Sequence, residues 1–421
     1  MQSAAGGPGK KISETGMPNG IRGFVRLLRT RPEFRRIWTC HCVSLLGDWL
    51  SYIAVSIISI EQGEGALAIA LVLVAHTLPA GLIAPISGPL ADRFDRRTLI
   101  IISYLGAFAL TLGMWGAASA GHVYLLQGLL LARGLVSGLG ITARTSSIPM
   151  VVEEDELYVA NALLGLTWSL LFTLGVALGG VATAVFSPNG AILLDAGTFM
   201  LAAFIAIGLP KLKPQPVSGP LPRPGLGGML TAWRFAQPNP EILTTLLAKT
   251  PQSMSNAAGW IALNLLAGSR LSTMELSLGI GLMQAVRAIG TGLGPLVPSH
   301  WYPLRSNLGT PFAFVGVCLF CLSENPWFFL PGLLLWGMGG GHNWVSSTAE
   351  LQKATPNHLL GRMVALDFML FCLSSSIIGV LVGLTIDATQ MVTETVMAAV
   401  SVAGLLWLSV MVLRHRHRTS Q

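Results

Sequence analysis

The chain has 421 residues, of which 52% are hydrophobic and only 11% are charged. Soluble domains carry about 25% charged residues, so this composition excludes an ordinary soluble enzyme or binding domain and indicates an integral membrane protein. The formal net charge of +7 does not indicate a nucleic-acid partner, because the basic residues are spread over short segments between apolar stretches.

Apolar segments long enough to cross a membrane recur along the chain. A helix needs about 20 mainly apolar residues to span the ~30 Å hydrocarbon core of a bilayer, and we count twelve such segments. The sequence therefore predicts an all-α integral membrane protein with twelve transmembrane helices. Their expected ranges are 36–60, 65–90, 98–119, 122–142, 159–185, 190–210, 241–267, 273–297, 308–323, 327–349, 363–387 and 391–413.

The basic residues indicate how these helices are oriented. If the N-terminus lies in the cytoplasm, nearly all of the 26 lysines and arginines fall in cytoplasmic segments, as the positive-inside rule requires. Residues 1–20 are polar and glycine-rich and have no apolar core followed by a cleavage site, so we do not expect a signal peptide. We expect a multi-pass protein with both termini in the cytoplasm.

Two features divide the chain into halves. Residues 211–240 are rich in proline and glycine, which is typical of a linker. Gly88-Pro89-Leu90-Ala91 at the end of the second span returns as Gly294-Pro295-Leu296-Val297 at the end of the eighth, and Pro32-Glu33 returns as Pro240-Glu241 before the seventh. This repetition predicts two six-helix pseudo-repeats. The expected parts are a basic cytoplasmic segment (1–35), two halves (36–210 and 241–413), the linker and a basic tail (414–421).

Several motifs carry a resemblance to a known family. The stretch from Gly88 to Arg97, with Asp92, Asp95 and three arginines between two apolar segments, resembles the loop between helices 2 and 3 of the major facilitator superfamily. Other strings resemble the branch that contains the enterobactin exporter and macrolide efflux proteins. They are Gly47 to Ala54, Ala160 to Leu164, Leu193-Leu194-Asp195 and Leu360-Gly361-Arg362. The antiporter signature of helix 5 is altered, because Val176 stands where that signature has proline.

The resemblance implies the major facilitator fold and a secondary active transporter. The function expected from this branch is proton-driven export, by antiport and alternating access, of a siderophore or similar amphipathic small molecule across the bacterial inner membrane. Two alternatives keep the same fold: efflux of a macrolide-like drug, and import of a siderophore or metabolite. We expect a monomer in the lipid bilayer, with a proton and a small molecule as its partners and no cofactor.

A membrane-embedded lipid enzyme is a more distant alternative. It would need a cluster of His, Asp, Ser or Cys at the membrane surface, and the acidic run Glu153 to Glu156 has no such neighbours. The chain also lacks the Gly-x-x-x-x-Gly-Lys-Ser/Thr signature of ATP-driven proteins, and no metal-binding spacing is found. We therefore predict that the protein is not an enzyme.

Asp48 and Arg133 are the candidate proton-coupling residues. They lie roughly 18 Å and 16 Å into their predicted spans at 1.5 Å per residue, and a charge at the bilayer centre costs at least ~2.5–3.5 kcal/mol. In the family fold, helices 1 and 4 line the central cavity, so the two side chains could face one another. The pairing would favour ionised Asp48, and its loss would let Asp48 accept a proton. The alternative is a permanent ion pair that holds the helices together.

The candidate substrate-binding residues lie in the seventh and eighth spans. Lys249, Gln252, Asn256 and Trp260 are spaced by three and four residues and so share one helix face, and Arg287 lies in the middle of the eighth span. A polar, basic face with an aromatic surface suits an amphipathic anion. In the alternative interpretation, Lys249 extends to the cytoplasmic interface and Arg287 has a structural role between the halves.

The resemblance also implies a cytoplasmic gate. In the family, the aspartate of the loop between helices 2 and 3 engages the start of helix 11, and its arginines pair with nearby acids. The corresponding residues are Gly88, Asp92, Arg93, Arg96, Arg97 and Arg362. Glu153 to Glu156 are possible partners of Arg96 and Arg97, and Asp367 is placed to pair with Arg362 across about one helical turn.

Overall fold

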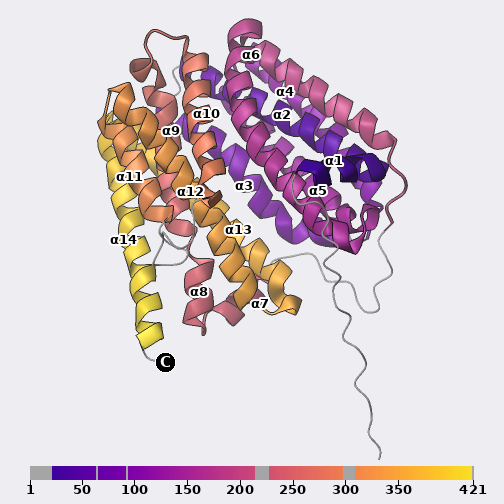
Figure 1. Ribbon diagram of the computed structural model, residues 1–421. Coiled ribbons are helices and arrows are strands. Elements are labelled where there is room, and N and C mark those ends of the chain that lie inside the picture. Colours follow the sequence, from indigo (N-terminus) through magenta and orange to yellow (C-terminus); the bar gives the residue numbers. More distant parts are fainter. Residues whose placement is uncertain (1–20, 63–64, 92, 214–226, 297–308, 420–421) are drawn as a thin grey trace, which may run out of the picture.

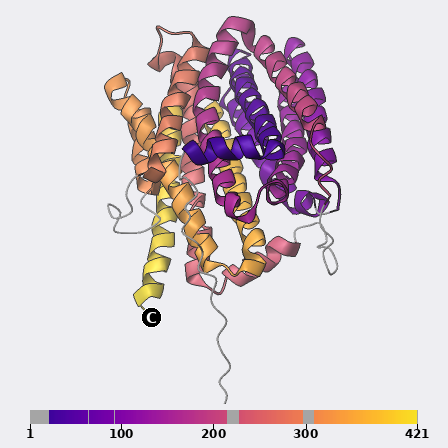
Figure 2. The same ribbon diagram turned by 45° about the vertical axis from the view of Figure 1, so that its right-hand side comes forward.

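The computed structural model describes residues 21–62, 65–91, 93–213, 227–296 and 309–419, and every regular element in these ranges is a helix. In Figure 1 and, from another direction, in Figure 2, the helices form two groups that lie side by side. One group comes from the first part of the chain (indigo to magenta) and the other from the last part (salmon to yellow). This arrangement is the all-α, two-half architecture that the sequence predicted.

The first group includes one element that serves as two membrane helices. Within α6 the backbone of Ser187 has φ 66° and ψ 162°, so two helical arms meet there at a bend. Pro188 cannot donate a backbone hydrogen bond, and the Ser187 Oγ accepts one from the Gly190 N–H at 3.3 Å, as an N-cap does. The elements are α1 (Ile21–Thr30), α2 (Pro32–Glu61), α3 (Gly65–Ala91), α4 (Arg96–Ser119), α5 (Val123–Val151), η1 (Glu154–Glu156) and α6 (Leu157–Ile207).

The second group differs from the prediction at its first membrane helix. The sequence predicted one span over 241–267, but the helix is interrupted at 247–249 between α8 and α9. Pro251 has no N–H for the carbonyl of Leu247, so the two segments cannot share one hydrogen-bond ladder. The elements are α7 (Gly227–Ala236), α8 (Pro240–Leu246), α9 (Thr250–Arg270), α10 (Leu276–Leu293), η2 (Gly294–Leu296), α11 (Gly309–Leu322), α12 (Pro326–Ala354), α13 (Asn357–Thr389) and α14 (Val392–Thr419).

Eight of the described helices are long and apolar enough to cross a membrane by length and composition alone. One of them is α6, which counts as two, and α9, α11 and α12 complete the twelve membrane helices that the sequence predicted. Two short helices were not predicted: α1 within the N-terminal segment and α7 within the linker. Both are only ten residues long, too short to register as membrane spans.

The two ends of the bundle can be told apart by their loops. One end of the bundle carries Arg31 and the loop from Arg93 to Arg97, which contacts Leu212, and we call it the basic end. The Arg96 N–H donates to the Leu212 carbonyl at 3.1 Å, and the Asp95 carboxylate accepts from the Leu212 N–H at 2.9 Å. The opposite end, which includes the bend at Ser187, is called the distal end.

The halves touch closely toward the distal end. Gly180 of α6 and Gly281 of α10 lie backbone against backbone, and a Cβ on Gly180 would come within 2.6 Å of the Ser277 carbonyl oxygen. Nearby, the Asp387 carboxylate of α13 accepts hydrogen bonds from the N–H groups of Ala66 (2.6 Å) and Leu67 (3.0 Å) at the start of α3. These contacts join the first half to the second.

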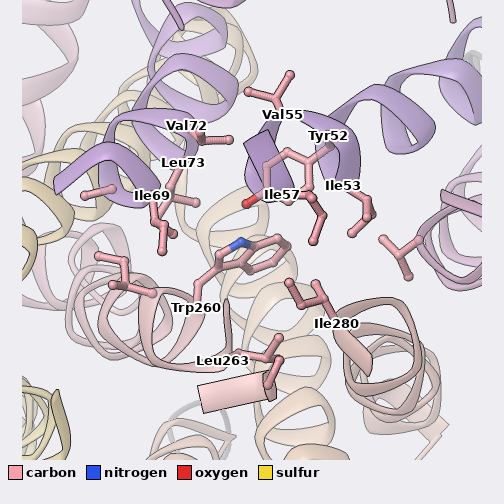
Figure 3. Packing of buried hydrophobic residues seen from close by; sticks show 14 of the residues in the cluster. Tyr52, Ile53, Val55, Ile57, Ile69, Val72, Leu73, Trp260, Leu263 and Ile280 are labelled. Carbon is pink, nitrogen blue, oxygen red and sulfur yellow. The ribbon is translucent and has the colours of Figure 1, made fainter. Parts of the chain in front are cut away.

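An apolar core continues across the boundary between the halves. In Figure 3, Tyr52 and Ile53 of α2 lie near Trp260 and Leu263 of α9, and Ile280 of α10 lies in the same cluster. The rings of Tyr52 and Trp260 meet edge to face, with their centroids 5.4 Å apart. Because these rings belong to different halves, any movement of one half against the other changes their contact.

Candidate functional site

Arg133 lies between two carboxylates in the interior of the first half. Its Nη2 is 3.3 Å from Oδ1 of Asp48, and its Nη1 forms an ion pair with Oδ2 of Asp195. Nη1 also donates to the Ser51 Oγ at 3.0 Å. The predicted neighbours Asp48 and Arg133 are thus brought together, and Asp195 joins them from the second arm of α6.

The local sequence explains how three helices can meet at this point. A Cβ at Gly47 would overlap Asp195 and Thr198, so only glycine allows α2 to approach α6 this closely. The Thr198 hydroxyl donates to an Asp195 oxygen at 3.3 Å. The Arg133 guanidinium also lies over the Phe199 ring, with its Cζ 5.4 Å from the ring centroid.

The two carboxylates differ in their access to solvent. The side chain of Asp195 is 0% exposed, whereas that of Asp48 is 27% exposed and lies farther from Arg133. With both acids ionised, one guanidinium faces two carboxylates, and the group carries one excess negative charge. A buried charge of this kind is costly, so a proton at the accessible carboxylate would neutralise the group.

The face predicted on the seventh span does point into the protein. Nδ2 of Asn343 on α12 donates to Oε1 of Gln252. The Asn256 Oδ1 lies 3.5 Å from Nη1 of Arg287, and Trp260 is buried. The structure therefore brings Asn256, Trp260 and Arg287 together, whereas Gln252 contacts a different helix.

Arg287 is enclosed by aromatic rings. Its Cζ lies 4.2 Å from the centroid of the Trp260 ring, 5.0 Å from that of Trp336 and 5.2 Å from that of Phe172. Its Nε donates to the Gln284 Oε1 at 3.0 Å. The side chain is deep in the protein, as the sequence analysis expected.

Lys249 has a partner that the sequence analysis did not assign. Its Nζ forms a buried ion pair with Asp367 of α13 and donates to the Thr348 Oγ1 at 2.9 Å. The ammonium also lies 4.5 Å from the Trp344 ring centroid. Lys249 therefore does not extend to the interface, and the expected pairing of Asp367 with Arg362 is wrong. The side chains of Lys249 and Asp367 are only 4% and 5% exposed. Their two charges are therefore neutralised by each other and not by water.

The predicted gate residues lie at the basic end, except that Asp92 is outside the described residues. Arg93 is exposed, and Arg362 of α13 packs beside Gly228 of α7. Arg96 donates to the Ser146 carbonyl at 2.5 Å, and Arg97 donates to the Ile207 carbonyl at 2.7 Å. A Cβ on Gly88 would meet no atom of the described residues within 4 Å.

Two of the acids expected as partners of Arg96 and Arg97 bind another residue. Glu153 and Glu156 form ion pairs with Arg31, between α1 and α2. Hydrogen bonds from Arg31 to Glu153 and then to Glu156 raise the pKa of its guanidinium. Arg31 reaches these acids because α1, which precedes it, packs against the start of α6.

Two functional candidates were missed by the sequence analysis, Asp195 and Asp367. Each is an ionisable residue inside an apolar span, which by itself marks a functional candidate. Their partners lie far away in the sequence, Arg133 on α5 and Lys249 just before α9, so the pattern of one helix could not identify the pairs.

Comparisons with known proteins agree with this architecture. The chain matches the family model described as Major Facilitator Superfamily over residues 37–379. The enterobactin exporter EntS of Salmonella typhi is 26% identical over 408 residues, which cover 92% of this chain and 93% of that protein. The uncharacterized MFS-type transporter YfiS of Bacillus subtilis (strain 168) is 29% identical over 186 residues, 44% of each chain.

Solved structures show the same fold at lower identity. The nucleoside transporter NupG superposes with a TM-score of 0.70 at 11% identity, covering 91% of this chain and 98% of that one. A bacterial homologue of the iron transporter ferroportin in an inward-facing state gives 0.67 at 14% identity, covering 90% and 98%. The family model matches most of the chain, and the structure has the two groups of membrane helices of that fold. The chain therefore belongs to the major facilitator superfamily and is a transporter, not an enzyme.

Proposed function

We propose that this protein is a proton-driven exporter of a siderophore or similar amphipathic small molecule. The observation that carries the proposal is the group Asp48, Arg133 and Asp195, in which one buried guanidinium serves two carboxylates. Asp195 is the permanent partner because it is fully buried and is also bonded by Thr198. Asp48 is the proton carrier because it is the more exposed and the more weakly held of the two.

Coupling follows from the charge of this group. When Asp48 is ionised the group carries one excess negative charge, and when it is protonated the group is neutral. Protonation therefore changes the relative stability of conformations that bury the group to different extents. A proton that moves inward down 100 mV supplies about 2.3 kcal/mol, which is enough to shift a conformational equilibrium about fortyfold.

The substrate site in this proposal is the inward face of α9, with Lys249 just before it, together with α10. Its residues are Lys249, Gln252, Asn256, Trp260 and Arg287. Asn256 and Trp260 contact Arg287 directly, and Phe172 and Tyr52 reach the same region from the first half. A site bounded by both halves is opened to one side or the other when the halves rock, as alternating access requires.

The orientation and the gate are part of the same proposal. Both termini, the segment 1–35, the linker 211–240 and the tail 414–421 lie in the cytoplasm of a bacterial cell, and the monomer spans the inner membrane with halves at 36–210 and 241–413. The basic end is then the cytoplasmic side, and Gly88, Asp92, Arg93, Arg96, Arg97 and Arg362 form its gate. Asp92→Asn is expected to slow turnover, and undiminished transport would argue against the gate.

The substrate and the direction of transport are tested together. We would delete the gene and compare cells and medium by mass spectrometry. An exporter predicts a compound that is retained in the mutant cells and released again when the gene is restored. Loss of a compound from the mutant cells would instead indicate import, and retention of an added macrolide would indicate drug efflux.

Proton coupling is tested by Asp48→Asn, with Glu61→Gln as a control that removes an exposed carboxylate. Purified variants would be reconstituted in liposomes, and transport of the identified compound would be followed with and without an imposed pH gradient. We expect Asp48→Asn to abolish the response to the gradient while the protein stays monodisperse, and Glu61→Gln to leave it unchanged. If Asp48→Asn transports like the wild type, the ion pair only holds the helices together.

A further inference from the structure

The interior cations that the sequence singled out differ in one respect. Arg133 is paired with Asp48 and Asp195, and Lys249 is paired with Asp367. Arg287 is 5% exposed, yet no carboxylate in the described part of the chain lies within 4 Å of its guanidinium, and its polar contacts are the two amide oxygens of Gln284 and Asn256.

This region of the protein contains several buried hydrogen-bond donors that are not used. The Arg287 Nη2 is buried and has no hydrogen-bond partner among the described residues, and the same holds for Nε2 of Gln284, the residue whose oxygen accepts from Arg287. The indole N–H of Trp49, whose ring lies 4.6 Å from that of Phe172, is likewise unpartnered. These three groups can only donate hydrogen bonds, so they are complementary to an oxygen that accepts, above all to an anionic one.

A purely structural role does not explain this arrangement. Burying an unpaired charge is among the costliest features of a protein interior, and cation–π contacts with the surrounding rings offset only part of that cost. Apolar residues of similar volume would pack this position at lower cost. The cation is therefore best explained by a charge that arrives from outside the chain.

The aromatic walls indicate what accompanies that charge. Trp260 and Trp336 belong to the second half and Phe172 to the first, so separation of the halves withdraws Phe172 and opens a slot beside the guanidinium. Flat walls favour a flat ligand, because aromatic rings stack on one another and on guanidinium.

We infer that Arg287 binds one anionic oxygen group, a carboxylate or phenolate, carried on an aromatic ring of the substrate. This inference rests on the proposed function, whose substrate site it specifies. It assigns the ligand's negative charge to Arg287, where no carboxylate of the described residues competes for it, and places the ring between Trp260 and Phe172.

The test uses salicylate as the probe and salicylamide as its neutral counterpart of the same shape. Binding to the purified full-length protein would be measured by isothermal titration calorimetry, without any proton gradient. We expect salicylate to bind at least tenfold more tightly than salicylamide, a difference of about 1.4 kcal/mol. Equal affinities in the wild type would overturn the inference, and this comparison does not depend on any variant folding.

Two variants locate the charge. Arg287→Gln should lower salicylate affinity at least tenfold and remove the preference over salicylamide. Arg270→Gln, which removes another largely buried arginine that is paired with Glu324, should retain the preference. Arg287→Lys keeps the charge but not the planar fork, so it should keep part of the preference. A full preference in a monodisperse Arg287→Gln protein would overturn the assignment.

The outcomes separate this inference from the proposed function. Proton-driven efflux that depends on Asp48, combined with no preference for salicylate, would refute the anion site and leave the exporter intact. A preference that depends on Arg287, combined with transport that ignores the proton gradient, would support the anion site and refute proton coupling.

Discussion

Asp387 offers the sharpest test of how the two halves are held together at the distal end. Its carboxylate accepts from the N–H groups of Ala66 and Leu67, the first turn of α3, at 2.6 Å and 3.0 Å. Gly65 precedes them with φ +73°, and a Cβ there would overlap the carboxylate. A residue of the second half thus serves as the N-terminal cap of a helix in the first half.

The magnitude of this contact can be worked from its geometry. A helix cap is worth about 0.5–2 kcal/mol, and a hydrogen bond to a charged group about 1.5–3 kcal/mol. In a conformation with the distal end open, water replaces these hydrogen bonds. The free-energy difference between the closed and open conformations that the carboxylate contributes therefore lies toward the lower of these values. Asp387→Ala should therefore disfavour the closed distal end by about 1–2 kcal/mol, a factor of roughly 5–30 in the ratio of closed to open molecules.

The assay is a distance measurement between spin labels. Cysteines would replace Gln62 in the first half and Met391 in the second, both exposed at the distal end, in a protein from which the five native cysteines have been removed. Asp387→Ala should increase the ratio of long to short distances by roughly 5–30-fold. Asp387→Asn, which keeps one acceptor oxygen but no charge, should fall in between.

The control and the refuting result are both well defined. Thr389→Ala changes an exposed residue one half-turn away and should leave the distances unchanged. If Asp387→Ala gives the same distance distribution as the wild type while the protein remains monodisperse, the cap does not hold the halves together.

Three further outcomes follow from the contacts inside the bundle. Lys249→Gln should lower the free energy of unfolding by about 3–5 kcal/mol, because it leaves the buried Asp367 carboxylate unpaired. Adding Asp367→Asn should recover most of this loss. Thermal melts in which the effects of the two substitutions simply add would contradict the prediction. Asp195→Ala should destabilise the protein more than Asp48→Asn, since Asp195 is the fully buried partner, and the same melts rank the two. Gly281→Val should increase the labelling of a cysteine introduced at the distal end, because a side chain at position 281 meets the α6 backbone at Gly180 and pushes the halves apart. Unchanged labelling would count against that contact.

The membrane helices could be predicted from sequence because a bilayer imposes a length. Every backbone polar group must be satisfied inside the hydrocarbon core, so an apolar stretch of sufficient length has no alternative to a helix. The bend at Ser187 falls in the gap between the predicted spans 159–185 and 190–210. The interruption after Leu246 was not predicted, because Pro251 lies within a stretch that otherwise looks like one span.

The site was predictable only in part. Asp48, Arg133 and Arg287 were identified because a charge within an apolar span is costly and needs a reason. The partners of those charges were not identified, since α2, α5 and α6 contribute one residue each to the group around Arg133. Which acid meets which base depends on how helices pack, and no periodicity within one helix contains that information.

The sequence by itself determined the class of protein, the number of spans and the residues whose charge is expensive, because these depend only on composition and local spacing. Tertiary structure alone decided that Lys249 is neutralised by Asp367 and that Arg287 has no carboxylate beside it in the described chain. The physical reason is that the energy of a buried charge is set by its neighbours across helices, and these are brought together only when the two halves pack.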